Sequence, residues 1–143
     1  MAQITYPNSQ STLTLNSYTF QHLMEGEALN FAPVNEKTSR TNAMNKGVSI
    51  TNRVDGGVHD VTIMVQRHSP DDAFLNAAKN EAEPVVFKGS AKRTYIDGGT
   101  RKKATMTLEA GSITTQPGTA ENNQDADNSR TYVIQFREAK ETF

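Results

Sequence analysis

The fold of this chain is decided between Val58 and Lys88, which read VHDVTIMVQRHSPDDAFLNAAKNEAEPVVFK. Apolar residues at every second position from 61 to 65 predict a strand with one buried face. Ser69 and Pro70 then predict a helix start, because serine can accept a backbone hydrogen bond and proline needs none at the first helical position. The stretch therefore predicts a strand, a capped helix and a second strand.

A narrow apolar stripe follows this helix start and consists of Phe74, Ala77 and Ala78, with Leu75 beside them. Asp71 and Asp72 lie at the positive end of the helix dipole, which explains both carboxylates without catalysis. Pro84 prevents the helix from continuing. Because so short a helix is not stable alone in water, we expect it to pack on the open end or side of a β-barrel or sandwich.

The chain has 143 residues, and we expect one domain over residues 1–143. Hydrophobic residues make up only 35% of the chain and tryptophan is absent, which indicates a thin two-layer β architecture. Much of its surface is then solvated or covered by partners. The net charge of -1 gives no global electrostatic reason for binding nucleic acid or an anionic membrane.

No cysteine is present, which excludes disulfides, thiolate chemistry and cysteine-ligated zinc. The first ten residues, MAQITYPNSQ, do not resemble a signal peptide, since no basic stretch precedes an apolar run. No run approaches the ~20 apolar residues of a membrane span. We therefore expect the protein to be made, and to act or assemble, in a cytosol-like compartment without a membrane partner.

Short alternating segments on both sides of the central stretch predict further strands. They lie at 12–20 (a hairpin or bent strand), 29–33, 48–53, 85–95, 104–115 with a bulge near Gly111, and 131–137. Turn signals at residues 55–57 and 97–99 predict hairpins that pair the strands on either side of each turn. The fold class is thus all-β with one short helix, as an antiparallel β-sandwich or barrel of about eight strands.

Two polar segments interrupt this pattern, at residues 33–47 and 116–130. Each is a loop of about fifteen residues, and loops of this length in a compact domain are usually functional or disordered.

Metal and catalytic motifs fail when they are tested by spacing. The combinations with ligand character are His22 with Glu25 and Glu27, His59 with Asp60, and His68 with Asp71. None repeats at ligand spacing. A calcium-loop opening at Asn123 fails because Asn128 and Ile134 replace the required glycine and glutamate. There is no nucleophile elbow and no phosphate loop, so we expect no metal, no cofactor and no enzyme activity.

Arg101-Lys102-Lys103 is the one compact basic run. It could contact phosphates together with Lys88 and Lys92, but no aromatic stacking partners are interleaved with it. A solvated shoulder of a hairpin is the simpler interpretation.

Several long blocks resemble a family of structural proteins from contractile-tailed bacteriophages, understood as the tail tube. These blocks are LTLNSYTFQHLMEGEALNFAP, DGGVHDVTIMVQRHSPDDAFLNA, PVVFKGSAK, and LEAGSITTQP followed by NNQD. The resemblance extends from Leu13 to Phe136 with the order and spacing kept.

The resemblance implies the tail-tube fold shared with the inner-tube protein of type VI secretion systems, a β-barrel or sandwich with one flanking helix. It implies hexameric rings that stack into a hollow tube inside a contractile sheath. The partners would be further copies of the chain, the sheath protein, and the baseplate and tail-terminator proteins. Genomic DNA would pass through the lumen without specific binding. The protein would belong to the virion and assemble in the host cytoplasm.

Under this interpretation, strand edges pair between subunits and so close the ring. We expect the loop 33–47, with Glu36, Lys37 and Arg40, to contact the adjacent ring. The acidic loop with Glu121, Asp125 and Asp127 is the second candidate.

Two sets of polar strand residues would line the lumen or face the sheath. They are Lys88, Ser90, Lys92 and Thr94, and Thr105, Thr107 and Glu109. A conduit for DNA should be neutral or acidic on balance. Two alternatives stay open: a tail-terminator or baseplate ring protein of the same fold, and a β-barrel nucleic-acid-binding module.

Overall fold

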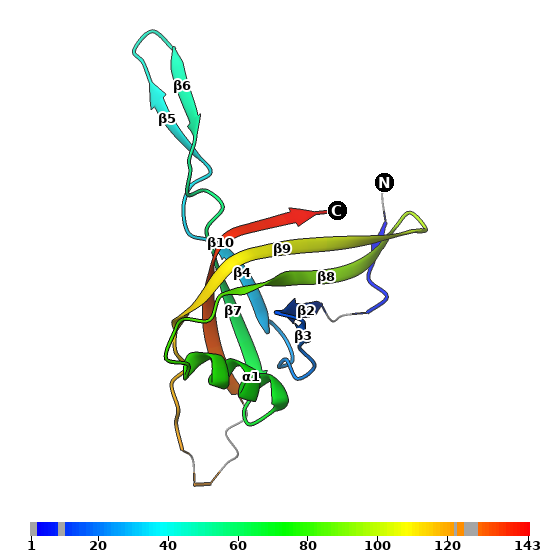
Figure 1. The fold of residues 1–143 in the computed structure, drawn as a ribbon. Coiled ribbons are helices and arrows are strands. Elements are labelled where there is room, and N and C mark those ends of the chain that lie inside the picture. Colours follow the sequence, from blue (N-terminus) through cyan, green and yellow to red (C-terminus); the bar gives the residue numbers. More distant parts are fainter. Residues whose placement is uncertain (1–2, 9–10, 122, 125–128) are drawn as a thin grey trace.

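The computed structural model describes residues 3–8, 11–121, 123–124 and 129–143. Within these ranges it contains one helix and ten strands (Figure 1). The elements are β1 Ile4–Thr5, β2 Thr12–Leu15, β3 Tyr18–Thr19, β4 Leu29–Pro33, β5 Thr38–Asn42, β6 Val48–Asn52, β7 His59–Gln66, α1 Pro70–Lys79, β8 Phe87–Asp97, β9 Thr100–Thr115 and β10 Ser129–Thr142. The expected all-β class with one short helix is confirmed.

Eight of the strands form one antiparallel sheet. Its order is β3-β2-β8-β9-β10-β7-β4, and β1 also pairs with β8. The three long strands β8, β9 and β10 lie side by side at its centre (Figure 1). The sheet is not closed into a barrel, because β4 at one end pairs with β7 alone among the described strands.

The predicted hairpin turn at 97–99 is confirmed by backbone conformation, and the segment 12–20 is a hairpin and not a bent strand. Gly98 and Gly99 join β8 to β9 with φ values of 55° and 87°, which glycine adopts without a steric penalty. Asn16 and Ser17 join β2 to β3 with φ values of 48° and 69°.

The predicted bulge near Gly111 is also present. Gly89 of β8 lies opposite Leu108 of β9, but Phe87 lies opposite Gly111, so β9 has one residue more in this interval. Ala110 adopts a φ of 52° there. Gly111 itself is required by packing, since a Cβ at this position would lie 2.4 Å from the ring of Phe136.

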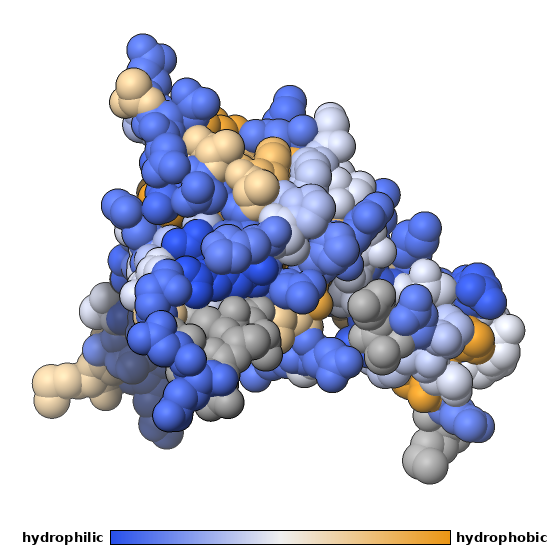
Figure 2. Space-filling view, turned by 90° about the horizontal axis from the view of Figure 1, so that it is seen from below, coloured by the Kyte–Doolittle hydropathy of each residue, from blue (hydrophilic) through white to orange (hydrophobic). Residues whose placement is uncertain are grey.

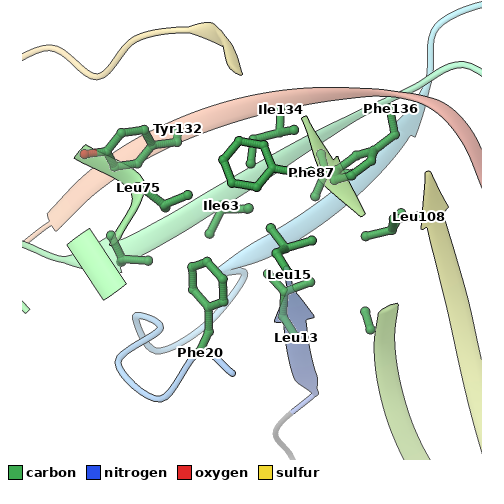
Figure 3. Close-up of a cluster of buried hydrophobic side chains, with 13 residues drawn as sticks. Leu13, Leu15, Phe20, Ile63, Leu75, Phe87, Leu108, Tyr132, Ile134 and Phe136 are labelled. Carbon is green, nitrogen blue, oxygen red and sulfur yellow. The ribbon is translucent and has the colours of Figure 1, made fainter. Parts of the chain in front are cut away.

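The hydrophobic core lies between the sheet and α1 (Figure 3). Alternate residues of β7 and β10 form its largest part, as their alternation predicted, together with residues of α1, β2, β8 and β9. The fully buried side chains include Leu13, Leu15, Val61, Ile63, Val65, Leu75, Phe87, Tyr132, Ile134 and Phe136. Phe74 joins α1 to this core by stacking on Tyr18 at a centroid distance of 4.4 Å.

The start of α1 is as predicted, with Ser69 as the N-cap. Its Oγ accepts the backbone N–H of Asp72 at 3.3 Å. The buried face of the helix differs from the predicted stripe, because Ala77 is exposed while Asp71, Asp72 and Leu75 are buried. The two carboxylates therefore do more than complement the helix dipole.

Both carboxylates connect α1 to distant parts of the chain. Asp71 accepts hydrogen bonds from the backbone N–H groups of Gln21 and His22 and from the hydroxyl of Tyr18. Asp72 accepts from the backbone N–H of His68 at 2.9 Å and from the hydroxyl of Tyr132 at 2.7 Å, and it faces Arg130. Since each buried carboxylate has several donors, the cost of its desolvation is offset.

Two expectations about residues 33–57 are wrong. The segment 33–47 is not a loop, because β5 lies within it and pairs with β6. The turn at Asp55 also does not pair β6 with β7, since both neighbours of β7 are other strands, β4 and β10. The physical reason is that β4 and β7 already form an antiparallel hairpin, and β5 and β6 continue that hairpin outward.

Within the described ranges, no helix is long and apolar enough to cross a membrane.

Candidate functional site

A two-stranded arm is the most unusual feature of the molecule. We use the term arm for residues 38–52, which comprise β5, β6 and the turn between them; it projects well beyond the main sheet (Figure 1). Every residue of β5 and β6 is exposed. An isolated two-stranded hairpin is marginally stable at best in water, so a partner surface would stabilise the arm.

The two faces of the arm differ in chemistry. On one face, Ile50 lies opposite Arg40 and Val48 lies opposite Asn42. Ile50 is 62% exposed, and Met44 near the tip is fully exposed. The other face carries only hydroxyl side chains, those of Ser39, Thr41, Ser49 and Thr51. An apolar stripe thus faces solvent in a chain with few hydrophobic residues.

The first set of predicted contact residues lies on the arm or at its base. Arg40 is in β5, and its Nε donates to Oδ1 of Asn42 at 3.2 Å. Glu36 and Lys37 lie at the base, where the backbone N–H of Arg53 donates to the Lys37 carbonyl at 3.0 Å. All three predicted residues are exposed.

An ion pair closes the base of the arm. Nε of Arg53 lies 3.0 Å from Oδ1 of Asp55. Its hydrogen bond holds the pKa of Asp55 below the usual value. This ion pair is well exposed and contributes little to stability. Because Arg53 already neutralises Asp55, Glu36 is the one remaining acidic residue of residues 36–55 near the positive charges of Lys37, Arg40 and Lys46. The arm is therefore basic.

The second set of predicted contact residues lies elsewhere. Glu121 is bound by Nη2 of Arg67, and this hydrogen bond lowers the pKa of its carboxyl group. Asp125 and Asp127 lie outside the described residues. The segment that carries Glu121 runs below α1, at the opposite end of the molecule from the arm (Figure 1). The segment that carries Glu121 thus lies far from Glu36, Lys37 and Arg40 and not beside them (Figure 1).

A groove of about 900 Å³ lies between the two ends of the curved sheet. One wall comes from β4, with Leu29 and Phe31, and the other from β1 and the end of β8, with Tyr6 and Tyr95. This groove marks the place where the predicted barrel would have closed.

The two polar strand faces predicted from sequence are one face. Lys92 lies directly opposite Thr105, and Ser90 lies opposite Thr107, so their side chains share a face. Its exposed charged residues within β8, β9 and β10 are Lys88, Lys92, Arg101, Lys103, Glu109, Glu138 and Lys140. The face is basic on balance.

The basic run is divided by the alternation of β9. Arg101 and Lys103 contribute to the polar face, whereas Lys102 lines the groove and contacts Asp97 at 3.4 Å. In the part of the chain that the structure describes, no three His, Asp or Glu side chains gather where they could hold a metal ion. Seen from the α1 end, the surface is predominantly hydrophilic, with small separate hydrophobic patches (Figure 2).

Sequence reasoning missed the apolar stripe and the groove. The stripe had a signal, because Val48 and Ile50 alternate in the sequence, but alternation alone does not tell whether a face is covered. The groove had no such signal, since its walls come from separate segments of the sequence, such as those with Tyr6, Phe31 and Tyr95.

Comparison with known proteins shows a likeness of fold without a likeness of sequence. No protein-family model matches the chain, and neither does the sequence of any curated protein. A chain from the cryo-EM structure of an extracellular contractile injection system, the PVC sheath-tube complex in the extended state, superposes with a TM-score of 0.64 at 5% identity. The alignment covers 96% of this chain and 91% of that one.

A chain from the cryo-EM structure of the anti-feeding prophage cap, a tube terminating cap, superposes with a TM-score of 0.63 at 8% identity. The alignment covers 98% of this chain and 92% of that one. At such identities the likeness concerns the fold and not the role. The chain therefore has the tube-type β fold found in components of contractile injection systems, with a sheet that stays open in the single chain.

Proposed function

We propose that this chain is a structural subunit of the tube of a contractile phage tail, in which hexameric rings stack into a hollow conduit inside a sheath. The observation that carries the proposal is the arm. Its stripe of Val48 and Ile50 is exposed in the single chain, and a second copy would bury it. The likeness in fold to a chain of a sheath-tube complex and to a tube terminating cap supports a role of this kind.

Ring formation would use the open ends of the sheet. The outer edge of β4 has no strand partner among the described residues, and exposed edges are templates for pairing with another chain. Two different edges on one subunit make a heterologous contact, which closes into a ring when the rotation permits. The single domain of residues 1–143 would thus become part of a continuous barrel.

Stacking of rings would use the two ends of the molecule. The arm is basic, and the segment with Glu121 lies at the other end (Figure 1). Asp125 and Asp127 in the sequence of that segment add negative charge. Head-to-tail stacking would bring opposite charges together, so Glu36, Lys37, Arg40, Glu121, Asp125 and Asp127 remain the proposed inter-ring contacts.

The lumen would be lined by a face other than the polar one. A conduit that lets DNA pass should not bind phosphates, and the face with Lys92, Lys103 and Lys140 is basic on balance. We assign this face to the sheath side or to subunit contacts. The sheath, baseplate and terminator proteins would be the other partners, the protein would reside in the virion, and no catalytic role is proposed.

A tube-terminating or baseplate ring is the second candidate function. It is favoured by the likeness of fold to the tube terminating cap of the anti-feeding prophage. Such a subunit would form one ring and stop. A nucleic-acid-binding module is the remaining alternative, and the basic polar face supports it.

Negative-stain electron microscopy of the purified full chain at high concentration tests the proposal. Hollow tubes of uniform width with an axial repeat are the expected result. Isolated rings that never lengthen would instead support the terminator or baseplate role. Monomers that are retained on DNA in a salt-dependent manner would contradict the tube and favour the binding module.

A further inference from the structure

The outer edge of β8 is covered by two short strands in different registers. β2 pairs with residues 89–92, and β1 pairs with Ile96 and Asp97. Neither β1 nor β2 pairs with residues 93–95 between them. Among the described residues, this edge therefore has no strand partner at residues 93–95, where it borders the groove.

The gap follows from the sequence of the N-terminal segment. Thr5 lies opposite Ile96, and Thr12 lies opposite Lys92. The N-terminal segment thus advances seven positions between these pairs where β8 advances four, so β1 and β2 cannot pair with β8 in one register. Pro7 lies in this segment and cannot donate a ladder hydrogen bond.

β1 is held on this edge by few interactions. It contributes two residue pairs, extended by one backbone hydrogen bond from Gly98 N to the Gln3 carbonyl at 3.1 Å. Ile4 is 48% exposed, and Tyr6 next to it is 53% exposed. Segments with so little burial open locally at a small cost in free energy.

One buried donor lies against Tyr6, which directly follows β1. The guanidinium carbon of Arg93 lies 4.2 Å from the ring centroid of Tyr6. Nε of Arg93 is buried and has no hydrogen-bond partner among the described residues. A buried unsatisfied N–H is costly, and the carbonyl of a strand lying along residues 93–95 could satisfy it.

β1 resembles β4 in sequence, and the two strands line the groove from opposite walls. β1 continues as Ile4-Thr5-Tyr6-Pro7, an apolar, a polar and an aromatic residue before a proline; β4 reads Leu29-Asn30-Phe31-Ala32-Pro33, with the same order. Ile4, Tyr6, Leu29 and Phe31 all line the groove. β4 is also the opposite end of the sheet.

We propose that β1 is a displaceable cover of an acceptor edge, and that β4 of a second copy replaces it along Arg93–Asp97 when subunits join. This inference rests on the proposed assembly function and names the two edges that meet. Until β1 leaves, Ile96 and Asp97 stay paired within the chain, which restrains assembly of free subunits.

A disulfide that fastens β1 to β8 tests the proposal. Ile4→Cys with Asp97→Cys places two cysteines directly opposite each other in an antiparallel pair, where Cα atoms lie about 4.5–5.5 Å apart and a disulfide fits. The chain has no other cysteine. Thr14→Cys with Thr19→Cys, across β2 and β3, is the matched control.

Assembly of each variant is followed by light scattering, with and without a reductant. The oxidised β1 variant should assemble at least about tenfold more slowly than its reduced form. The reason is that the disulfide lowers the population of chains in which β1 has left the edge of β8. The control should assemble equally in both forms. Equal rates for the oxidised and reduced β1 variant would overturn the proposal while leaving tube formation intact.

A second variant tests the opposite direction without a crosslink. Ile4→Ser with Tyr6→Ser weakens the cover and should shorten the lag before assembly by a factor of several, since more chains have an open edge. An unchanged lag would contradict the proposal. Failure of the unmodified chain to assemble at all would overturn the assembly function itself.

Discussion

The carboxylate of Asp71 accepts the hydroxyl hydrogen of Tyr18 at 2.7 Å, which ties the first turn of α1 to β3 across 53 positions of the sequence. The same carboxylate accepts the backbone N–H groups of Gln21 and His22. A single side chain thus holds the helix against the β2–β3 end of the sheet.

Asp71→Ala should destabilise the fold by about 2–4 kcal/mol, because it leaves two backbone donors and a hydroxyl near the core unsatisfied. Urea denaturation of the monomer measures the change in free energy of unfolding. Tyr18→Phe is the matched control, since it removes one donor and should cost about 1 kcal/mol. An Asp71→Ala variant as stable as the parent chain would contradict this account of the anchor.

Asp72 should make stability depend on pH in the acid range. Burial acts to raise its pKa, but hydrogen bonds from His68 N and the Tyr132 hydroxyl, together with the charge of Arg130, hold the pKa below its usual value. A carboxyl with a depressed folded-state pKa stabilises the fold above its unfolded-state pKa of ~3.9, and that stability is lost as pH falls through the folded-state value.

Urea midpoints measured from pH 7 down to about pH 2.5 check this prediction. The parent chain should lose stability below pH ~4, and Asp72→Asn should flatten that part of the curve. Identical pH profiles for the two proteins would show that Asp72 is not the group responsible.

Gly111→Ala should destabilise the fold by about 1–3 kcal/mol, because the added Cβ overlaps the buried ring of Phe136 and overpacks the core. Gly118→Ala is the control, since nothing lies within 4 Å of a Cβ built there. That change should be neutral within about 0.5 kcal/mol. Thermal unfolding followed by circular dichroism distinguishes them, and equal shifts in Tm would contradict the packing argument.

Ile50→Ser with Val48→Ser should leave the monomer folded but impair assembly, because both side chains are exposed in the single chain and would be buried between copies. Ser49→Ala with Thr51→Ala changes the opposite face of the arm and serves as the control. Light scattering measures assembly, and circular dichroism checks the fold. Assembly of the stripe variant at the parent rate would remove the stripe from the interface.

The strands and the helix that contribute to the hydrophobic core were predictable, because burial of one face leaves a periodic pattern of apolar residues in the sequence. Val61, Ile63 and Val65 alternate and are fully buried in β7, and the Ser69 cap starts α1 as expected. The turn at Gly98 was predictable because positive φ favours glycine.

What escaped prediction depends on contacts that are distant in sequence. β5 reads Thr-Ser-Arg-Thr-Asn and has no core to impose a pattern, so it was interpreted as a loop. The helix dipole explained why Asp71 and Asp72 occur in the first turn of α1, but it did not predict that they are buried. Their partners Tyr18 and Tyr132 lie more than fifty positions away in the sequence. A closed barrel was among the expected folds, but the sheet is open. Alternation shows which face of a strand is buried, but it does not show at which strand a sheet ends.

The central claim, that the arm joins copies of this chain into a tube, is tested most directly by removing the arm. Replacing Thr38–Asn52 with Asn-Gly joins Lys37 to Arg53, which already share a backbone hydrogen bond of 3.0 Å, through a two-residue hairpin turn. Electron microscopy then compares this variant with the full chain at equal concentration. The account predicts long hollow tubes from the full chain, and rings or monomers that do not lengthen from the variant. Tubes of equal length from both proteins would contradict it.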